Sequence, residues 1–138
     1  MRIKLLIILL ICFASDVYSQ KSRQAYCEVI VWPHHVRYHA AVTFDFGMQS
    51  YTAAMLYDSK NQPLRFVSGM DAVNYLSKRG WRVVSSYYKT INKGESTHFV
   101  MEKTVTNDKQ VIEGLVLKEM KLDEFYEKMQ IPHYSPNE

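Results

Sequence analysis

The stretch from Ser68 to Tyr88 limits the possible folds of this chain more than any other part of the sequence. Ser68, with Asp71 three residues later, forms a capping-box pattern, in which the two side chains accept hydrogen bonds from the free amides of a first helical turn. Three apolar residues then recur on one side of a helical spiral, at Ala72, Val73 and Leu76. This spacing predicts a helix over Ser68–Arg79 with one narrow apolar face.

Gly80 and Trp81 mark the end of the predicted helix. Glycine adopts the left-handed conformation of a helix C-terminal cap without steric cost, so Gly80 suits that position. The large ring of Trp81 is expected to fold back over the helix end as an apolar cover. From Trp81 to Ile91 the residues follow the two-residue period of a strand, so the sequence predicts a helix followed directly by a strand.

Two hairpins are predicted, one before and one after this helix. Ala25–Trp32 and Val36–Phe46 are rich in β-branched and aromatic residues, and a short connection around Pro33 would join them as an antiparallel pair. The strand after the helix and Thr97–Val105 form a second pair across a loop that contains glycine. A further short strand is expected at about Ala53–Tyr57, where apolar residues alternate.

Two hairpins around a single helix, without repeated alternation of strands and helices, favour an α+β fold. We expect an antiparallel sheet of four to five strands with one main helix packed on one face, plus a C-terminal helical or irregular segment. In that segment, Asp108 to Gly114 is expected to be helical. Leu115 to Met129 either continues the helix or alternates as a strand, because Gly114 inside a helix would cost about 1 kcal/mol relative to alanine.

The first residues have the pattern of a secretory signal peptide. Arg2 and Lys4 give a basic start, Leu5–Phe13 is the apolar run, and Val17–Ser19 resembles a cleavage site. The apolar run is shorter than the roughly 20 residues of a membrane-spanning helix, so the mature protein is not expected to be an integral membrane protein. We therefore expect a periplasmic or secreted protein organised as a signal peptide at 1–19, an α+β domain at 20–107 and a C-terminal segment at 108–138, with a disordered end.

The charge balance of the mature chain argues against nucleic acid as a partner. Loss of Arg2, Lys4 and Asp16 with the signal reduces 17 basic and 14 acidic residues to 15 and 13. Nothing in this nearly neutral chain supplies the clustered cations that phosphate backbones require. Cys27 is the single cysteine left, so no intrachain disulfide is possible, and Cys27 is expected to be a small buried apolar residue.

The histidines give the one candidate for metal chemistry. His34, His35 and His39 lie within six positions, and His35 and His39 would share a face of one strand. Zinc needs three or four ligands, and no cysteine or helical histidine motif supplies the others, so we expect no metal and no cofactor. His98 stands apart from the other histidines, and no catalytic residue is assigned. The alternative function is a small periplasmic hydrolase or metal-dependent enzyme that uses His35 and His39.

Aromatic residues are the one compositional excess, at 13% of the chain with ten tyrosines. Strand alternation is expected to leave Trp32, Tyr87 and Tyr88 available for binding, since aromatic side chains supply contact area at low entropic cost. The competing interpretation is that the C-terminal segment covers them as a second core layer. We expect an exported, non-catalytic binding or interaction module, whose partner is another envelope or extracellular protein or a carbohydrate-like ligand.

Several short motifs resemble those of small secreted bacterial proteins of unknown function. The motifs are Tyr26-Cys27, Asp45-Phe46-Gly47, Asp71-Ala72-Val73-Asn74-Tyr75-Leu76 and Gly80-Trp81. The likeness spans about Ala25 to Gly114. It implies an export signal, an α+β domain and no known activity, and it transfers no functional residue to this chain.

Overall fold

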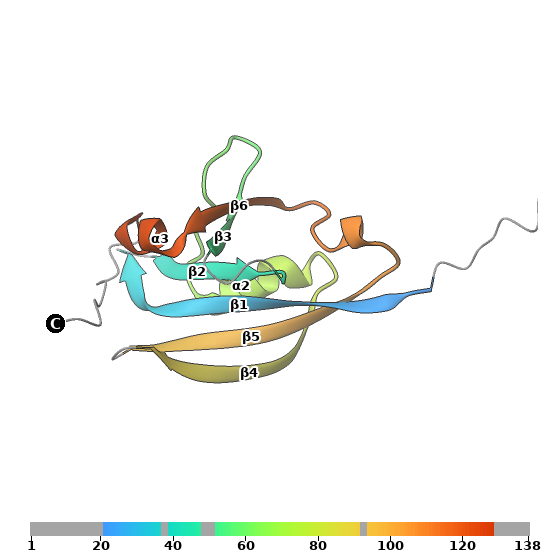
Figure 1. Cartoon of the computed structure of the whole chain (residues 1–138), viewed down its shortest axis with the longest axis horizontal. Helices are drawn as coiled ribbons and strands as arrows, with labels where there is room; N and C mark the ends of the chain where they lie inside the picture. The colour runs from blue at the N-terminus through green and yellow to red at the C-terminus, as the bar shows by residue number, and fades with distance from the viewer. Residues whose placement is uncertain (1–20, 37–38, 48–51, 92–93, 129–138) are drawn as a thin grey trace, which may run out of the picture.

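The structure is a computed structural model that describes residues 21–36, 39–47, 52–91 and 94–128. These residues form an antiparallel sheet of six strands in the spatial order β4, β5, β1, β2, β3, β6 (Figure 1). The strands are β1 (Arg23–Val36), β2 (His39–Asp45), β3 (Thr52–Tyr57), β4 (Arg82–Ile91), β5 (Gly94–Val105) and β6 (Val116–Lys121). The helices are α2 (Gly69–Ser77), α3 (Leu122–Lys128) and a 3-10 turn η1 (Asp108–Gln110). The expected signal peptide at 1–19 and the expected disordered end at 131–138 lie outside the described residues.

The expected α+β fold, an antiparallel sheet of four to five strands with one main helix packed on one face, is wrong. The sheet has six strands among the described residues, and the helices are short, with nine residues in α2 and seven in α3. The sixth strand is β6, in a segment for which the sequence left a helix and a strand as alternatives, and it pairs antiparallel with β3. Gly114 has a left-handed backbone (φ 73°) just before β6, so it lies in a turn and not inside a helix. The fold is therefore mainly β.

The β1–β2 hairpin forms, but its turn lies later than the sequence predicted. β1 continues past Pro33 to Val36, and the pairing with β2 changes register between Val31 and His35. Proline has no backbone N–H to donate, so an irregularity of this kind is where a strand tolerates it. The predicted β4–β5 hairpin is confirmed, with Ile91 opposite Gly94 and a register shift between Val83 and Ser85.

The start and end of α2 follow the predicted capping signals. The Ser68 hydroxyl accepts a hydrogen bond from the amide of Asp71 at 3.2 Å, and the Asp71 carboxylate accepts one from the amide of Val67 at 3.1 Å. Gly80 has a left-handed backbone (φ 87°), and the side chain of Trp81 is buried immediately after it. At the other end, Gly69 lets the helix approach the sheet closely. A Cβ at this position would lie 2.4 Å from a methyl group of β1.

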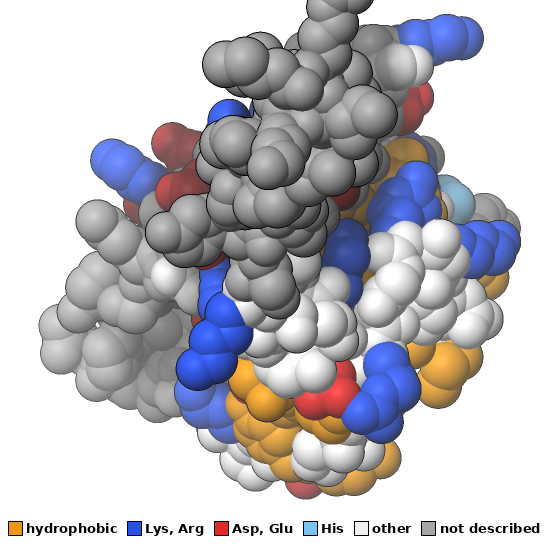
Figure 2. All heavy atoms as spheres, turned by 90° about the vertical axis from the view of Figure 1, so that its right-hand side faces the viewer, with side chains coloured by type: hydrophobic (Ala, Val, Ile, Leu, Met, Phe, Trp, Pro, Cys, Tyr) orange, Lys and Arg blue, Asp and Glu red, His pale blue; other side chains and the backbone are white. Residues whose placement is uncertain are grey.

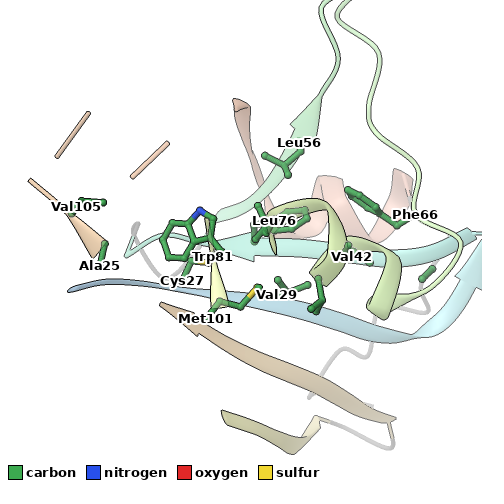
Figure 3. Close-up of a cluster of buried hydrophobic side chains, with 14 residues drawn as sticks. Ala25, Cys27, Val29, Val42, Leu56, Phe66, Leu76, Trp81, Met101 and Val105 are labelled. Atoms are coloured by element: carbon green, nitrogen blue, oxygen red, sulfur yellow. The ribbon is translucent and has the colours of Figure 1, made fainter. Parts of the chain in front are cut away.

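The face of the sheet that carries α2, called here the inner face, holds the larger apolar core. Side chains from β1, β2, β5 and α2 meet there, as Figure 3 shows. The fully or nearly fully buried members are Ala25, Cys27, Val29, Ala40, Val42, Phe44, Leu56, Phe66, Ala72, Val73, Leu76, Trp81, Met101 and Val105.

The opposite or outer face is divided into two halves. Over β2, β3 and β6, Phe125 of α3 is fully buried on a second apolar cluster, which makes the covered half; its buried residues are Ala41, Ala53, Met55, Tyr57 and Phe125. Over β1, β5 and β4, the outward positions make a surface called here the open half. Its residues include Tyr26, Glu28, Ile30, Arg82, Ser85, Tyr87, Lys89, Ser96, His98, Val100 and Glu102. In this half Tyr26 and Tyr87 remain exposed.

Candidate functional site

The pairing of three strands brings four polar side chains together in the open half. Ile30 of β1, His98 of β5 and Tyr87 of β4 lie in one row across the sheet. Glu28 is two residues from Ile30 along β1, and Ser96 is two residues from His98 along β5. Because alternate residues of a strand share a face, all of these side chains point outward.

Glu28, Tyr87, Ser96 and His98 form a hydrogen-bonded unit, called here the polar cluster. The Nδ1 atom of His98 lies 3.1 Å from Oε2 of Glu28, and its Nε2 atom lies 2.9 Å from Oγ of Ser96. The hydroxyl of Tyr87 donates to Oε1 of Glu28 at 2.8 Å. The hydroxyl of Ser96 donates to the carbonyl of Lys89 at 3.2 Å. Each of the four side chains therefore has at least one partner inside the protein.

The number of protons available in the polar cluster limits which of its hydrogen bonds can form at the same time. A serine hydroxyl has one proton, and a carboxylate has none to donate. When Ser96 donates to Lys89 and Glu28 is ionised, His98 has to donate from both ring nitrogens for all the bonds to form at once. Alternatively, Nδ1–H of a neutral ring donates to Glu28 and Nε2 accepts the proton of Ser96, so the hydroxyl of Ser96 has two alternative acceptors, the ring and the carbonyl of Lys89.

Tyr87 forms the boundary between the buried cluster and solvent. Ser96 and His98 are only 1% and 5% exposed, whereas Tyr87 is 41% exposed. The ring of Tyr87 stacks on the ring of His98, with 4.6 Å between centroids and an angle of 19°. Burial raises the pKa of Tyr87 to about 12, and the hydrogen bond to Glu28 and the negative charge there add to the rise. The site thus presents one face of a tyrosine whose ring and hydroxyl are both held in place.

The three aromatic residues expected to bind partners lie in three different settings. Tyr87 is in the open half, as described above. Tyr88, its neighbour in β4, lies on the inner side of the sheet and is 74% exposed. Trp32 is half-buried under α3, where its Nε1 donates to the hydroxyl of Thr43 at 3.0 Å and its ring lies 5.7 Å from that of Phe125. The structure therefore brings only Tyr87 of the three into the polar cluster.

The two histidines considered for metal binding are on different strands. His35 belongs to β1 and is opposite Ala40, whereas His39 belongs to β2 and is opposite Val36. The premise that both occupy one strand face is therefore wrong, since the chain reverses between them. Within the described ranges, no group of three or more histidine, cysteine or acidic residues is placed to hold a metal ion.

His98 was not among the predicted site residues, because it is far from the other histidines in the sequence. Its partner Glu28 is 70 positions away, so the pair forms only because β1 and β5 are neighbours in the sheet. The predicted strand began at Thr97 and left Ser96 in the loop, whereas β5 begins at Gly94, so Ser96 and His98 share one face of the same strand. The pairing of β1 with β5 was the missing step.

Cys27 is the other ionisable group that the fold perturbs strongly. It is buried on the inner face, directly before Glu28 in β1. Burial raises the pKa of its thiol to about 12, and the negative charges of Asp45 and Glu28 add to the rise. A thiol of this kind stays protonated at neutral pH and is a poor nucleophile. Cys27 therefore acts as a core residue, as the sequence predicted.

The arrangement of Ser96, His98 and Glu28 has the order of a nucleophile, a base and an orienting carboxylate. The distances of 2.9 Å and 3.1 Å are within hydrogen-bond reach. However, the hydroxyl of Ser96 is buried and is directed to a backbone carbonyl. The observed geometry therefore fixes Tyr87 and does not present a serine to a substrate.

No protein-family model, curated protein or solved structure matches this chain. The resemblance to small secreted bacterial proteins thus stays a prediction. The geometry of the open half is what supports a function.

Proposed function

We propose that this chain is an exported, non-catalytic binding module that acts in the periplasm or outside the cell. Export rests on the basic and apolar pattern of residues 1–19. In the part of the chain that the structure describes, no helix combines the length and the apolar character needed to cross a membrane. The binding function rests on the open half of the sheet.

The observation that carries this proposal is the immobilised, exposed ring of Tyr87. Binding normally costs about 0.5–1.5 kcal/mol for each flexible side chain that becomes fixed at an interface. Tyr87 is already fixed, because its ring stacks on His98 and its hydroxyl donates to Glu28. Pre-organised aromatic residues of this kind are typical of interface hot spots. The buried residues of the polar cluster thus hold both the ring and the hydroxyl of Tyr87 in place.

The surroundings of Tyr87 favour a cationic group on the partner. The carboxylate of Glu28 accepts the hydrogen bond of the Tyr87 hydroxyl, and its side chain is 30% exposed, so a negative charge reaches solvent beside the Tyr87 ring. Exposed Tyr26 and half-buried Val100 provide apolar contact area next to this carboxylate. An arginine or lysine of another exported protein fits this combination, because it can pair with a carboxylate and stack on an aromatic ring.

Selection of binding peptides from a random phage-displayed library on the immobilised protein tests this proposal. We expect enriched sequences to contain arginine or lysine, and the corresponding synthetic peptides to lose about tenfold or more in affinity for a Tyr87→Ala variant. Tyr88→Ala is the matched control, since Tyr88 is the adjacent, more exposed tyrosine on the opposite face. Equal loss in both variants, or enrichment of acidic peptides, would contradict the proposed site. Binding of oligosaccharides at Tyr87 instead of peptides would change the ligand class.

A second candidate function, a small hydrolase, is favoured by one observation, the order of Ser96, His98 and Glu28. It replaces the expected pair His35 and His39, which lie on different strands. Mass spectrometry after treatment with a fluorophosphonate reports an activated serine directly. For a binding module we expect Ser96 to remain unlabelled. Labelling of Ser96 that disappears in a His98→Ala variant would establish the hydrolase instead.

A further inference from the structure

The strand β4 forms one edge of the sheet, and its outer side has no strand partner among the described residues. β4 has ten residues, whereas β6 at the opposite edge has six. An edge strand exposes a row of backbone N–H and C=O groups, which are a template for another strand. A partner that binds the long edge of β4 through these groups therefore has to be an extended peptide segment.

The two edges differ in how they are protected against such pairing. Natural sheets block edge pairing with short edge strands and charged side chains, and β6 has both features, with Lys118, Glu119 and Lys121 among its six residues. The central six residues of β4, Val83–Tyr88, contain no charge, no proline and no glycine. Uncharged segments of six residues with high β-propensity are those that pair readily with other strands. A register shift between Val83 and Ser85 is the one irregularity of this edge.

Exposed apolar side chains are also concentrated on β4. Four of the nine large hydrophobic residues that are exposed in the described part of the chain belong to it: Val83, Val84, Tyr87 and Tyr88. Figure 2 shows hydrophobic side chains at the surface in the lower part of the molecule, at the height of β4 in Figure 1. Apolar area of this kind supplies the driving force for association that backbone hydrogen bonds alone provide only weakly.

We propose that β4 pairs antiparallel with β4 of a second copy of this chain, centred on Ser86. This register places Val84 opposite Tyr88 of the second copy and Ser85 opposite Tyr87 of the second copy. The paired residues of Val84–Tyr88 are all uncharged, so no two like charges face each other in this register. The self-complementary register is the reason for choosing a second copy over a different protein. The twofold axis is perpendicular to the sheet, so both open halves lie on the same side of a twelve-stranded sheet.

The dimer and the function proposed for the open half are tested separately: the Ser86 variants act on the inward side of the β4 edge, whereas peptide binding is tested at the outward ring of Tyr87. Loss of dimerisation and loss of peptide binding are therefore separate outcomes. A dimer would present two copies of Tyr87 to one partner.

Sedimentation velocity over a range of concentrations tests the dimer. We expect the purified protein to sediment at twice the monomer mass at high concentration. Ser86→Lys and Ser86→Glu variants are each expected to be monomeric, because Ser86 faces its own equivalent across the twofold axis and like charges would be opposed. An equal mixture of the two variants is expected to restore the dimer. Val116→Lys is the matched control, since Val116 is a similarly exposed residue of the other edge strand, and it is expected to leave the dimer intact.

A monomer at every concentration would overturn the proposal. A dimer that persists in both Ser86 variants, or one that is lost in Val116→Lys, would also overturn it, because the interface would then lie elsewhere. Circular dichroism of each variant confirms that a monomeric result is not caused by unfolding.

Discussion

The covered and open halves of the outer face belong to the same sheet but are stabilised by different interactions. In the covered half, the outward positions of β2 and β3 include the buried apolar residues Ala41, Ala53 and Met55, and Phe125 of α3 is fully buried on them. In the open half, the equivalent positions of β1 and β5 include Glu28 and His98, and no apolar cluster forms there among the described residues. One half is stabilised by burial, and the other by hydrogen bonds.

This difference has a consequence for rigidity. A buried polar side chain without a partner costs about 1–3 kcal/mol, so polar groups in the open half are tolerated only in a complete network. The same network fixes Tyr87 in an exposed position, which burial under a helix would not allow. The covered half thus contributes stability, and the open half supports recognition.

The largest effect is expected from opening the covered half. Phe125→Ala removes the buried anchor of α3 together with its contact to Trp32, and it should lower the free energy of unfolding by about 3–5 kcal/mol. Urea unfolding followed by fluorescence measures this change. Val116→Ala in the same half is the control and should cost no more than about 0.5 kcal/mol. A loss below about 1 kcal/mol for Phe125→Ala would mean that α3 is not part of the core.

A smaller effect is expected from breaking the network of the open half. Glu28→Ala removes the acceptor shared by His98 and Tyr87, and it should cost about 1–3 kcal/mol in unfolding free energy. Glu95→Ala, at an exposed position of β5, is the control and should change stability by no more than about 0.5 kcal/mol. Equal stability of both variants would show that the network does not hold the open half together.

The local signals of this sequence predicted local structure well. The Ser68 cap, the left-handed Gly80, the buried Trp81 and the β4–β5 hairpin each depend on residues close in sequence, and the structure has all four. The shift of the first turn beyond Pro33 was not predictable in this way, because pairing across the irregularity outweighed the preference of proline for strand ends.

The sheet order and the polar cluster could not be predicted, because they depend on contacts between distant segments. The alternation of Val116–Lys121 fits a strand, but only pairing with β3 favours the strand over a helix there. Likewise, strand alternation places Tyr87 and Tyr88 on opposite faces of the sheet, but it does not determine which of the two lies in the open half. That choice follows from α2 packing on the inner face and from Glu28 lying two strands away from Tyr87.

The raised pKa of Tyr87 predicts that the stability of the open half depends on pH in the alkaline range. Its pKa is raised from 10.0 to about 12, by burial first and then by Glu28. As the pH rises, the unfolded chain therefore loses this proton before the folded protein does. The stability that Tyr87 contributes should be fully present below about pH 10 and be lost as the pH rises through about 12. Carbon NMR of labelled tyrosine measures the pKa, which should fall towards the ordinary value in Glu28→Ala, and an unchanged value would contradict the hydrogen bond.

The smallest effect is expected at the exposed rim of the open half. Tyr26→Ala should change the unfolding free energy by no more than about 0.5 kcal/mol, because this side chain is exposed and has no part in the polar cluster. The same variant should weaken binding of the selected peptides. A stability loss above about 2 kcal/mol would place Tyr26 in a core and would contradict an uncovered face.

Hydroxyl-radical footprinting with mass spectrometry tests the division of the outer face most directly, because it reports the solvent exposure of each side chain. Tyr26 and Tyr87 should be oxidised readily, whereas Met55, Tyr57 and Phe125 should be protected. Methionine is intrinsically reactive towards oxidants, so protection of Met55 would be strong support for the covered half. Protection of Tyr26 and Tyr87 equal to that of Tyr57 would contradict the account, since the open half would then be covered in solution.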